Sequence, residues 1–296
     1  EKASDPTTSG MEGFGPTIGR SQKNMKNLKL LTSIVSSITL VGALGISGAQ
    51  AADDRIAKIE ASGELRVCHA EDNPWTYRDP LTGKWLGFTR DLAADLAEEL
   101  GVELVDVDST WKTIVPSVKN DECDIGGGGL FATVTRAKVV LFTIPFAYAH
   151  STAIVHKESS YSSYKELDKP GKLIIGSAGT ATLEFAKRFF KHAEVKGLPV
   201  DTDAILLGEI ANQRADGWWT TTTKGIKFLD ENPQFKARLI GDEPEDYIAV
   251  SWAINLEEYH FQQTLDRWLT RHIRAGKTAT LWEKWFGSDY ARGDYL

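Results

Sequence analysis

The sequence is poor in the residues that make up common catalytic and metal centres. It has two cysteines and six histidines in 296 residues, and the histidines show no HExxH or similar spacing, so we expect no metal site. After residue 51 there is no GxSxG turn, and neither cysteine stands in a sequence context that would activate its thiol. We therefore expect no cofactor and none of the common catalytic centres.

The chain also has no excess of positive charge. It carries 34 basic and 41 acidic residues, and the part after residue 51 has a net charge of −9. This balance argues against a nucleic-acid or anionic-membrane surface, since each needs a clustered basic face. With 42% hydrophobic and 25% charged residues, the composition is globular and not disordered, collagen-like or disulfide-dense. Small molecules are the expected partners.

An apolar segment near the start of the chain has the pattern of a targeting signal. From Met25, two lysines precede an apolar stretch that is diluted by serine, threonine and glycine and ends in Ala-Gln-Ala. This predicts a signal peptide over residues 25–51, because the stretch is too short and too polar for a membrane anchor. Residues 1–24 are interpreted as an upstream remnant. No cysteine follows the apolar run, so we expect a freely soluble protein in the periplasm.

The two cysteines, Cys68 and Cys123, are expected in neighbouring parallel strands. One falls late in its strand and the other at the start of its own. An oxidising compartment permits a bridge between them, but the expected offset exceeds the reach of a disulfide. We therefore expect two buried free thiols.

Beyond residue 53 the pattern alternates strands and helices. Leu92, Leu96 and Leu100 follow one another at every fourth position and Gly101 comes next, which predicts a helix and its end. Strands separated by single helices indicate parallel units of an α/β fold. The expected strands are 65–70, 102–107, 124–128, 172–176 and 217–220, and the expected helices are 88–100, 111–119, 182–192, 205–213 and most of 256–286.

Four consecutive glycines, Gly126 to Gly129, follow the third expected strand. Neither the GK[ST] ending of a phosphate-binding loop nor a GxGxxG spacing accompanies them, so a phosphate site is not expected. Consecutive glycines do permit close backbone approach, with several N–H groups facing a ligand anion.

Short motifs follow one another in a fixed order along residues 54 to 287. They are Pro74-Trp75-Thr76-Tyr77, Gly87-Phe88-Thr89-Arg90-Asp91-Leu92, Trp111-Lys112-Thr113-Ile114-Val115-Pro116, Thr133-Val134-Thr135-Arg136, Phe142-Thr143-Ile144-Pro145-Phe146 and Gly179-Thr180-Ala181-Thr182. In their order and spacing, these motifs resemble those of the bacterial extracellular solute-binding proteins of family 3, the periplasmic amino-acid receptors of ABC transporters.

The resemblance implies an α/β, two-lobed fold of the periplasmic-binding-protein type (type II), with a hinge between lobes that close on a ligand. Lobe 1 would hold residues 52–147 plus 248–296, and lobe 2 would hold residues 148–247. The hinge would lie at 148–153 and 247–251.

The resemblance also implies a carboxylate clamp in the first lobe. Arg136 stands where the family pairs an arginine with the α-carboxylate of the ligand, and a guanidinium matches a carboxylate with two parallel hydrogen bonds. Backbone groups at Gly129 and Phe131 would share that carboxylate. The alternative is an arginine that caps the preceding turn.

Further ligand contacts are expected from the same lobe. Trp111 matches a pocket-lining aromatic position of the family, and Trp75 lies in the first strand-to-helix loop, where aromatic residues often face the ligand. Glu71 and Asp72 in that loop are candidate partners of a ligand ammonium. The alternatives are core positions for the tryptophans and solvated positions for the acids.

Three threonines are the candidate ligand-binding residues of the second lobe. Thr180 and Thr182 begin a helix whose free N–H groups favour an anionic or polar ligand group, with plain N-capping as the alternative. Thr221 stands where amino-acid receptors of the family usually carry an aspartate for the ligand ammonium. A neutral hydroxyl cannot neutralise that charge, so the ligand either lacks the amine or has it held by Glu71 or Asp72.

The expected function is therefore that of a monomeric periplasmic receptor that delivers a small carboxylated solute, an amino acid or a related organic acid, to an inner-membrane ABC permease. The sequence also resembles the periplasmic cyclohexadienyl dehydratases built on this fold. Such a dehydratase needs a proton donor for the leaving hydroxyl. The start of the second-lobe helix offers Thr180 and Thr182, which are not carboxyl groups, and the side chain of Glu184 is expected to lie along the helix instead of facing the ligand. We therefore expect a binding protein and not an enzyme. A sensory receptor is a third interpretation.

Overall fold

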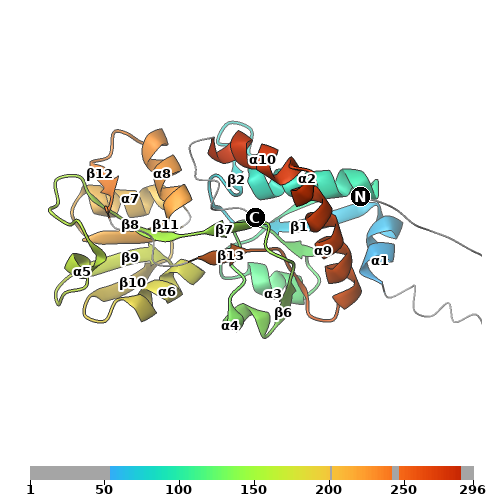
Figure 1. Ribbon diagram of the computed structural model, residues 1–296, viewed down its shortest axis with the longest axis horizontal. Helices are drawn as coiled ribbons and strands as arrows, with labels where there is room; N and C mark the ends of the chain where they lie inside the picture. The colour runs from blue at the N-terminus through green and yellow to red at the C-terminus, as the bar shows by residue number, and fades with distance from the viewer. Residues whose placement is uncertain (1–53, 201, 242–246, 288–296) are drawn as a thin grey trace, which may run out of the picture. The chain divides into compact units, whose positions relative to one another are not determined.

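The computed structural model describes residues 54–200, 202–241 and 247–287 (Figure 1). All of them belong to one compact unit, Ser47–Leu296. The predicted signal peptide and the residues before it lie outside the described residues. Within these ranges, no helix combines the length and the apolar character needed to cross a membrane.

Two five-stranded sheets form the centres of two α/β lobes. In the first sheet, β1 is parallel to β4 and β5, and β14 runs antiparallel to β5 and β6. In the second sheet, β9 is parallel to β10 and β11, and β8 runs antiparallel to β11 and β12. The strands of the first sheet, in spatial order, are β4 (Glu103–Asp108), β1 (Glu64–His69), β5 (Ile125–Gly126), β14 (Ala253–Asn255) and β6 (Val140–Phe142). Those of the second are β10 (Glu194–Leu198), β9 (Leu173–Ser177), β11 (Gly217–Thr221), β8 (Ser151–His156) and β12 (Ala237–Leu239).

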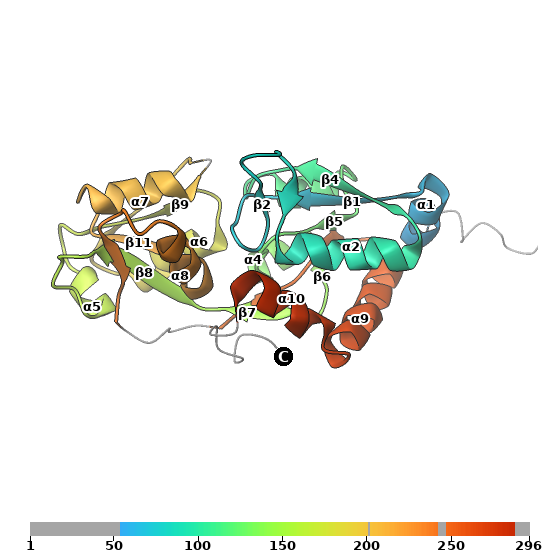
Figure 2. The same cartoon turned by 90° about the horizontal axis from the view of Figure 1, so that it is seen from above.

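Helices surround each sheet, and Figure 1 and Figure 2 show α2 beside the C-terminal helix α10. The first lobe has α1 (Arg55–Ser62), α2 (Phe88–Leu100), α3 (Ile114–Lys119), α4 (Val134–Ala137), α9 (Tyr259–Arg274) and α10 (Lys277–Phe286), with the small hairpin of β2 (Tyr77–Arg78) and β3 (Trp85–Leu86). The second lobe has α5 (Tyr164–Leu167), α6 (Ala181–Phe189), α7 (Asp203–Ala211) and α8 (Thr222–Glu231).

A two-stranded ladder carries both chain connections between the sheets. Strand β7 (Ala147–Ala149) leads from the first sheet to the second, and β13 (Ile248–Val250) leads back, antiparallel to it. Two backbone segments therefore join the lobes within the described residues, which is the arrangement expected of a hinge. The domain bounds 52–147 plus 248–296 and 148–247 stay a prediction.

The strands and helices expected from the sequence lie within about three residues of observed ones, but other elements, among them β8 and α8, were not expected. The helix expected over residues 88–100 has those bounds, and Gly101 ends it with a φ of 69°. The helix expected over 182–192 ends three residues earlier, because the backbone of Phe190 is extended. Strand β11 includes Thr221, one residue more than expected.

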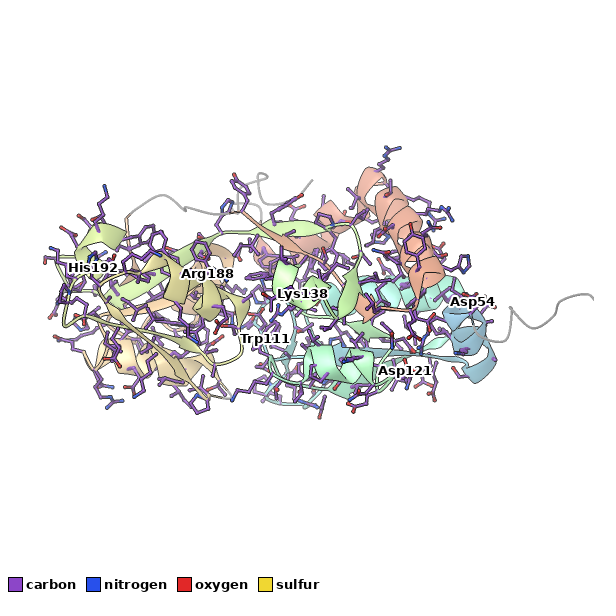
Figure 3. The ribbon with its side chains drawn as sticks, turned by 90° about the horizontal axis from the view of Figure 1, so that it is seen from below. Asp54, Trp111, Asp121, Lys138, Arg188 and His192 are labelled. Atoms are coloured by element: carbon purple, nitrogen blue, oxygen red, sulfur yellow. A yellow bond between two sulfur atoms is a disulfide. The ribbon has the colours of Figure 1, made fainter. Side chains whose placement is uncertain are left out.

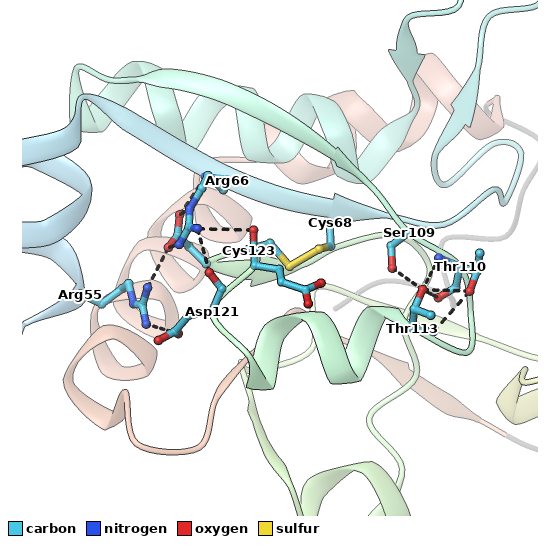
Figure 4. The surroundings of a disulfide bond; sticks show 10 residues. Arg55, Arg66, Cys68, Ser109, Thr110, Thr113, Asp121 and Cys123 are labelled. Carbon is cyan, nitrogen blue, oxygen red and sulfur yellow. Dashed lines mark hydrogen bonds and ion pairs between the residues drawn. A yellow bond between two sulfur atoms is a disulfide. The ribbon is translucent and has the colours of Figure 1, made fainter.

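The cysteine prediction is wrong, because Cys68 and Cys123 form a disulfide (Figure 4). The prediction placed Cys123 at the start of a strand, where each residue advances the chain by more than 3 Å. The strand begins only at Ile125, and Cys123 lies in the bend between α3 and β5. This bend brings the two Cα atoms to 5.7 Å, within the reach of a disulfide.

Candidate functional site

A small cavity of about 30 Å³ lies where both lobes contribute side chains. The first lobe supplies Asp72, Trp111, Gly129, Phe131 and Arg136, and the second supplies Thr180, Ala181, Thr182, Thr220, Thr221 and Lys224. The lobes approach closely here: a Cβ built on Gly179 would stand 2.7 Å from the Cγ of Lys112. Figure 3 shows Trp111 at this edge of the first lobe.

Eight of the ten predicted site residues line this cavity, and the exceptions are Glu71 and Trp75. Residues from 72 to 221 in the sequence thus meet in one place. Lys224, by contrast, lines the cavity but was not predicted from the sequence.

Arg136 is a largely buried cation that has no carboxylate partner among the described residues. It lies in the short helix α4, and Thr133 caps that helix by accepting from the Arg136 N–H at 3.3 Å. Its Nη1 donates to the carbonyl of Phe131 at 3.1 Å, and burial lowers the pKa of the guanidinium to about 10. A guanidinium has five N–H donors, so this bond leaves most of them for an anion in the cavity.

Gly129 lets two side chains approach the backbone of the glycine run. A Cβ at this position would stand 2.6 Å from Oδ2 of Asp72 and 3.0 Å from Cγ of Trp75. Any larger residue would push one of them away. The backbone at Gly129 is therefore closely approached, as predicted for the glycine run. The groups that approach it are side chains of the same lobe.

The hydroxyls of Thr180 and Thr182 form hydrogen bonds at the start of α6. Thr180 Oγ1 accepts from the Leu183 N–H at 3.3 Å and donates to the Ser177 carbonyl at 2.8 Å. Thr182 donates its hydroxyl proton to Thr180 Oγ1 at 3.0 Å. Thr180 is therefore an N-cap, as the alternative interpretation held. The first N–H groups of α6 lack intrahelical acceptors and remain the polar groups suited to a ligand.

Lys224 stands in an unusual position for a lysine. Thr221 caps α8 by accepting from the Lys224 N–H at 3.4 Å, so the lysine lies in the first helical turn, where the helix dipole disfavours a cation. The residue is also only 9% exposed. Two carboxylates offset both costs, since Nζ lies 2.6 Å from Oδ1 of Asp72 and 2.7 Å from Oδ2 of Asp203.

This Asp72–Lys224–Asp203 triad joins the lobes, because Asp72 follows β1 and the other two residues belong to α7 and α8. Burial alone would lower the pKa of Lys224, but the two carboxylates outweigh it and the pKa is raised. Burial raises the pKa of Asp72 to about 6, although the Lys224 ammonium lowers it in part. The triad is therefore fully ionised only above about pH 6.

The raised pKa of Asp72 makes stability depend on pH. The native pKa of about 6 exceeds the ordinary aspartate value of 3.8, so the native state binds more protons than the unfolded state between these two pH values. The contribution of Asp72 to the free energy of unfolding is thus largest below pH 4 and is lost as the pH rises through 6. Relative to an Asp72→Asn protein, we expect wild type to gain about 2–3 kcal/mol between pH 7.5 and 4 in urea unfolding. If the difference in free energy of unfolding between wild type and Asp72→Asn were the same at both pH values, this expectation would be contradicted.

Glu71 lines a neighbouring, larger cavity of about 570 Å³ and not the small one. Its carboxylate accepts from the backbone N–H of Arg78 at 3.2 Å, and burial raises its pKa. Trp111 lines both cavities, and Asp203 of the larger cavity binds Lys224, which lines the small one. In the described part of the chain, no group of three or more His, Cys, Asp and Glu residues could hold a metal ion.

The predicted role of Trp75 as a ligand-facing aromatic is wrong, because the residue is 1% exposed and packs in the core of the first lobe. Its ring lies 4.9 Å from that of Phe286 and 5.7 Å from that of Trp282, edge to face. Both partners belong to α10, about 200 residues later in the chain. A sequence pattern around Trp75 cannot reveal this contact.

Comparisons with known proteins agree on one family. The profile of the bacterial extracellular solute-binding proteins, family 3, matches residues 65–288. A cyclohexadienyl dehydratase of Pseudomonas aeruginosa is 27% identical over 239 residues, which cover 80% of this chain and 87% of the enzyme. A putative ABC transporter arginine-binding protein of Escherichia coli is 28% identical over 205 residues, which cover 68% of this chain and 82% of that protein.

Solved structures give the same result. A putative ABC transporter binding component of Wolinella succinogenes, complexed with lysine, has a TM-score of 0.71 and 29% identity, covering 77% of this chain and 97% of that one. An ancestral amino-acid-binding protein, described as a precursor of cyclohexadienyl dehydratase, has a TM-score of 0.71 and 28% identity, covering 78% of this chain and 99% of that one.

Proposed function

Since the chain belongs to the bacterial extracellular solute-binding proteins, family 3, we propose that its small interlobe cavity captures a carboxylated solute for uptake by an ABC transporter. The predicted two-lobed α/β fold of the type II periplasmic binding proteins is confirmed. The family implies a periplasmic or extracellular location. Export by the signal peptide over 25–51, an inner-membrane permease as partner and a monomeric state belong to the proposal.

One observation carries the proposal: Arg136 presents an uncompensated guanidinium to the cavity. A buried cation without an acidic partner is unfavourable unless an anion joins it. A ligand carboxylate fits the fork of a guanidinium, and each charge-assisted bond contributes about 1.5–3 kcal/mol. The N–H groups at the start of α6 would meet the same ligand from the second lobe, so that binding favours closure.

Thermal unfolding with and without added solutes tests this function. We expect amino acids or organic acids that bind to raise the melting temperature in a concentration-dependent way, because a ligand of the native state stabilises it by mass action. Amines without a carboxylate serve as the control and should have no effect. A protein that responds to no carboxylate at millimolar concentration would contradict the proposal.

Dehydration of a cyclohexadienyl acid is the second candidate function. It is favoured by the Pseudomonas relative and by Asp72, a cavity-lining carboxyl with a pKa of about 6, since a general acid works best with a pKa near the working pH. Against it, Asp72 is already bound to Lys224 at 2.6 Å. Incubation with prephenate distinguishes the two functions, because turnover to phenylpyruvate would show an enzyme and binding without turnover a receptor.

A further inference from the structure

The wall of the small interlobe cavity carries a carboxylate, Asp72, as well as the guanidinium of Arg136. We propose that Asp72 accepts hydrogen bonds from the α-ammonium of an amino-acid ligand whose carboxylate binds Arg136. The first lobe then binds both charged groups of the ligand. This inference rests on the proposed function and identifies the residue that distinguishes an amino acid from other carboxylates.

Asp72 is a buried acid whose capacity to accept hydrogen bonds is largely unused. The residue is 6% exposed. Its Oδ1 forms an ion pair with Nζ of Lys224 at 2.6 Å, yet this oxygen accepts no hydrogen bond among the described residues. The hydrogen bond of Nζ goes to Oδ2 of Asp203, at 2.7 Å. Because a buried acceptor without a donor is unfavourable, a donor on the ligand would stabilise Asp72.

The other oxygen of Asp72 lies beside the backbone segment that leads to the carboxylate site. A Cβ on Gly129 would stand 2.6 Å from Oδ2 of Asp72, and Arg136 donates to the carbonyl of Phe131, two residues further on. Two residues of chain span at most about 7 Å. Two charge-assisted bonds of about 2.8 Å, with the head group of an amino acid between them, cover a similar length. One ligand can therefore reach both side chains.

No other acid lines the small cavity in the described part of the chain. Glu71 and Asp203 line the larger neighbouring cavity instead. On the wall from the second lobe, Thr221 is neutral, and its Oγ1 accepts from the backbone N–H of Lys224. Asp72 is therefore the group on this wall that can balance the charge of a ligand ammonium.

The charges around the cavity favour a ligand that carries both signs. When ionised, Asp72 and Asp203 share the single ammonium of Lys224, so the triad has one negative charge in excess. Arg136 supplies one positive charge to the same cavity. A zwitterionic amino acid preserves this balance. A carboxylate without an amine leaves an excess negative charge in a buried site, which is costly.

Calorimetric titration at pH 7.5 with pairs of ligands tests the inference. Each pair is an amino acid and the acid of the same carbon skeleton without its α-amino group: phenylalanine and 3-phenylpropanoate, leucine and 4-methylpentanoate, glutamate and glutarate, arginine and 5-guanidinopentanoate. Within a pair that binds, we expect the amino acid to bind about 10- to 100-fold more tightly, because its ammonium adds a charge-assisted hydrogen bond.

An Asp72→Asn protein shows whether this preference comes from Asp72. The substitution keeps the size of the side chain and removes its charge, so we expect the preference for the amino acid to fall about 10-fold or more. A change in packing alone would weaken both members of a pair alike and leave the preference intact. Asp230→Asn is the matched control, because Asp230 is exposed on α8, and it should keep the wild-type preference. Circular dichroism confirms folding of each variant.

The outcomes separate this inference from the proposed function. If no acid of any pair binds, the carboxylate site itself is overturned. If wild type binds the acids without an amine as tightly as the amino acids, the ammonium site is wrong and the receptor function stands. A folded Asp72→Asn protein with an unchanged preference would overturn the inference, as would a preference that falls in Glu71→Gln instead.

Discussion

An Arg136→Ala protein is expected to bind carboxylate ligands about 30- to 1,000-fold more weakly than the unchanged protein. Arg136 is the cavity-lining cation without an acidic partner in the described structure, since Lys224 is shared by two carboxylates. In the proposed mode of binding, truncation removes both parallel hydrogen bonds to the ligand carboxylate together with the charge that balances it. The dissociation constant from calorimetric titration measures the effect directly.

Two further variants give this prediction its specificity. Arg136→Lys keeps the charge but loses the planar fork, so its affinity should fall between those of wild type and Arg136→Ala. Arg188→Ala removes an exposed arginine on α6 and should bind like wild type (Figure 3). An Arg136→Ala protein with an unchanged dissociation constant would show that the carboxylate is held elsewhere.

In the absence of ligand, Lys224→Met is expected to lower the free energy of unfolding by about 3–5 kcal/mol at pH 7.5. The substitution keeps the apolar length of the side chain and leaves two carboxylates, Asp72 and Asp203, without their shared cation. An unpaired buried charge is much more costly than a missing surface contact. Urea unfolding at fixed pH gives the value.

The pH dependence and a second substitution show whether the triad is the cause. The loss should be smaller at pH 5, because Asp72 with its pKa of about 6 then takes up a proton and no longer needs the cation. The double variant Lys224→Met/Asp72→Asn should recover part of the lost stability, which a double-mutant cycle expresses as a coupling energy. The exposed control Lys187→Met should change stability by less than about 0.5 kcal/mol. A loss below about 1 kcal/mol for Lys224→Met would mean that the triad does not stabilise the native state.

Much of the first-lobe site was predictable because its short motifs resemble those of the family and lie close together in the sequence. Thr133 caps the turn that carries Arg136, and the glycine run leads the chain to Phe131, all within ten residues. Local patterns of this kind depend on backbone conformation, which neighbouring residues control. Thr180 was found from the start of its helix and Thr221 from the resemblance to the family, and both prove to be N-caps.

Lys224 was missed because its role depends on partners that are distant in the sequence. Asp72 lies about 150 residues earlier and Asp203 about 20 residues earlier. A sequence signal was nevertheless present: a lysine in the first turn after a threonine cap opposes the helix dipole and therefore suggests a nearby acid. It did not indicate which acid, or that the acid would come from the other lobe.

The sequence by itself determined the α/β alternation and the approximate bounds of the expected elements through periodicity and caps, and the family through short ordered motifs. The tertiary structure alone decided that Trp75 packs under α10, that Cys68 meets Cys123, and that Lys224 joins acids of both lobes. In each of these cases the partner lies far along the chain, and burial and electrostatic pairing depend on distance in space.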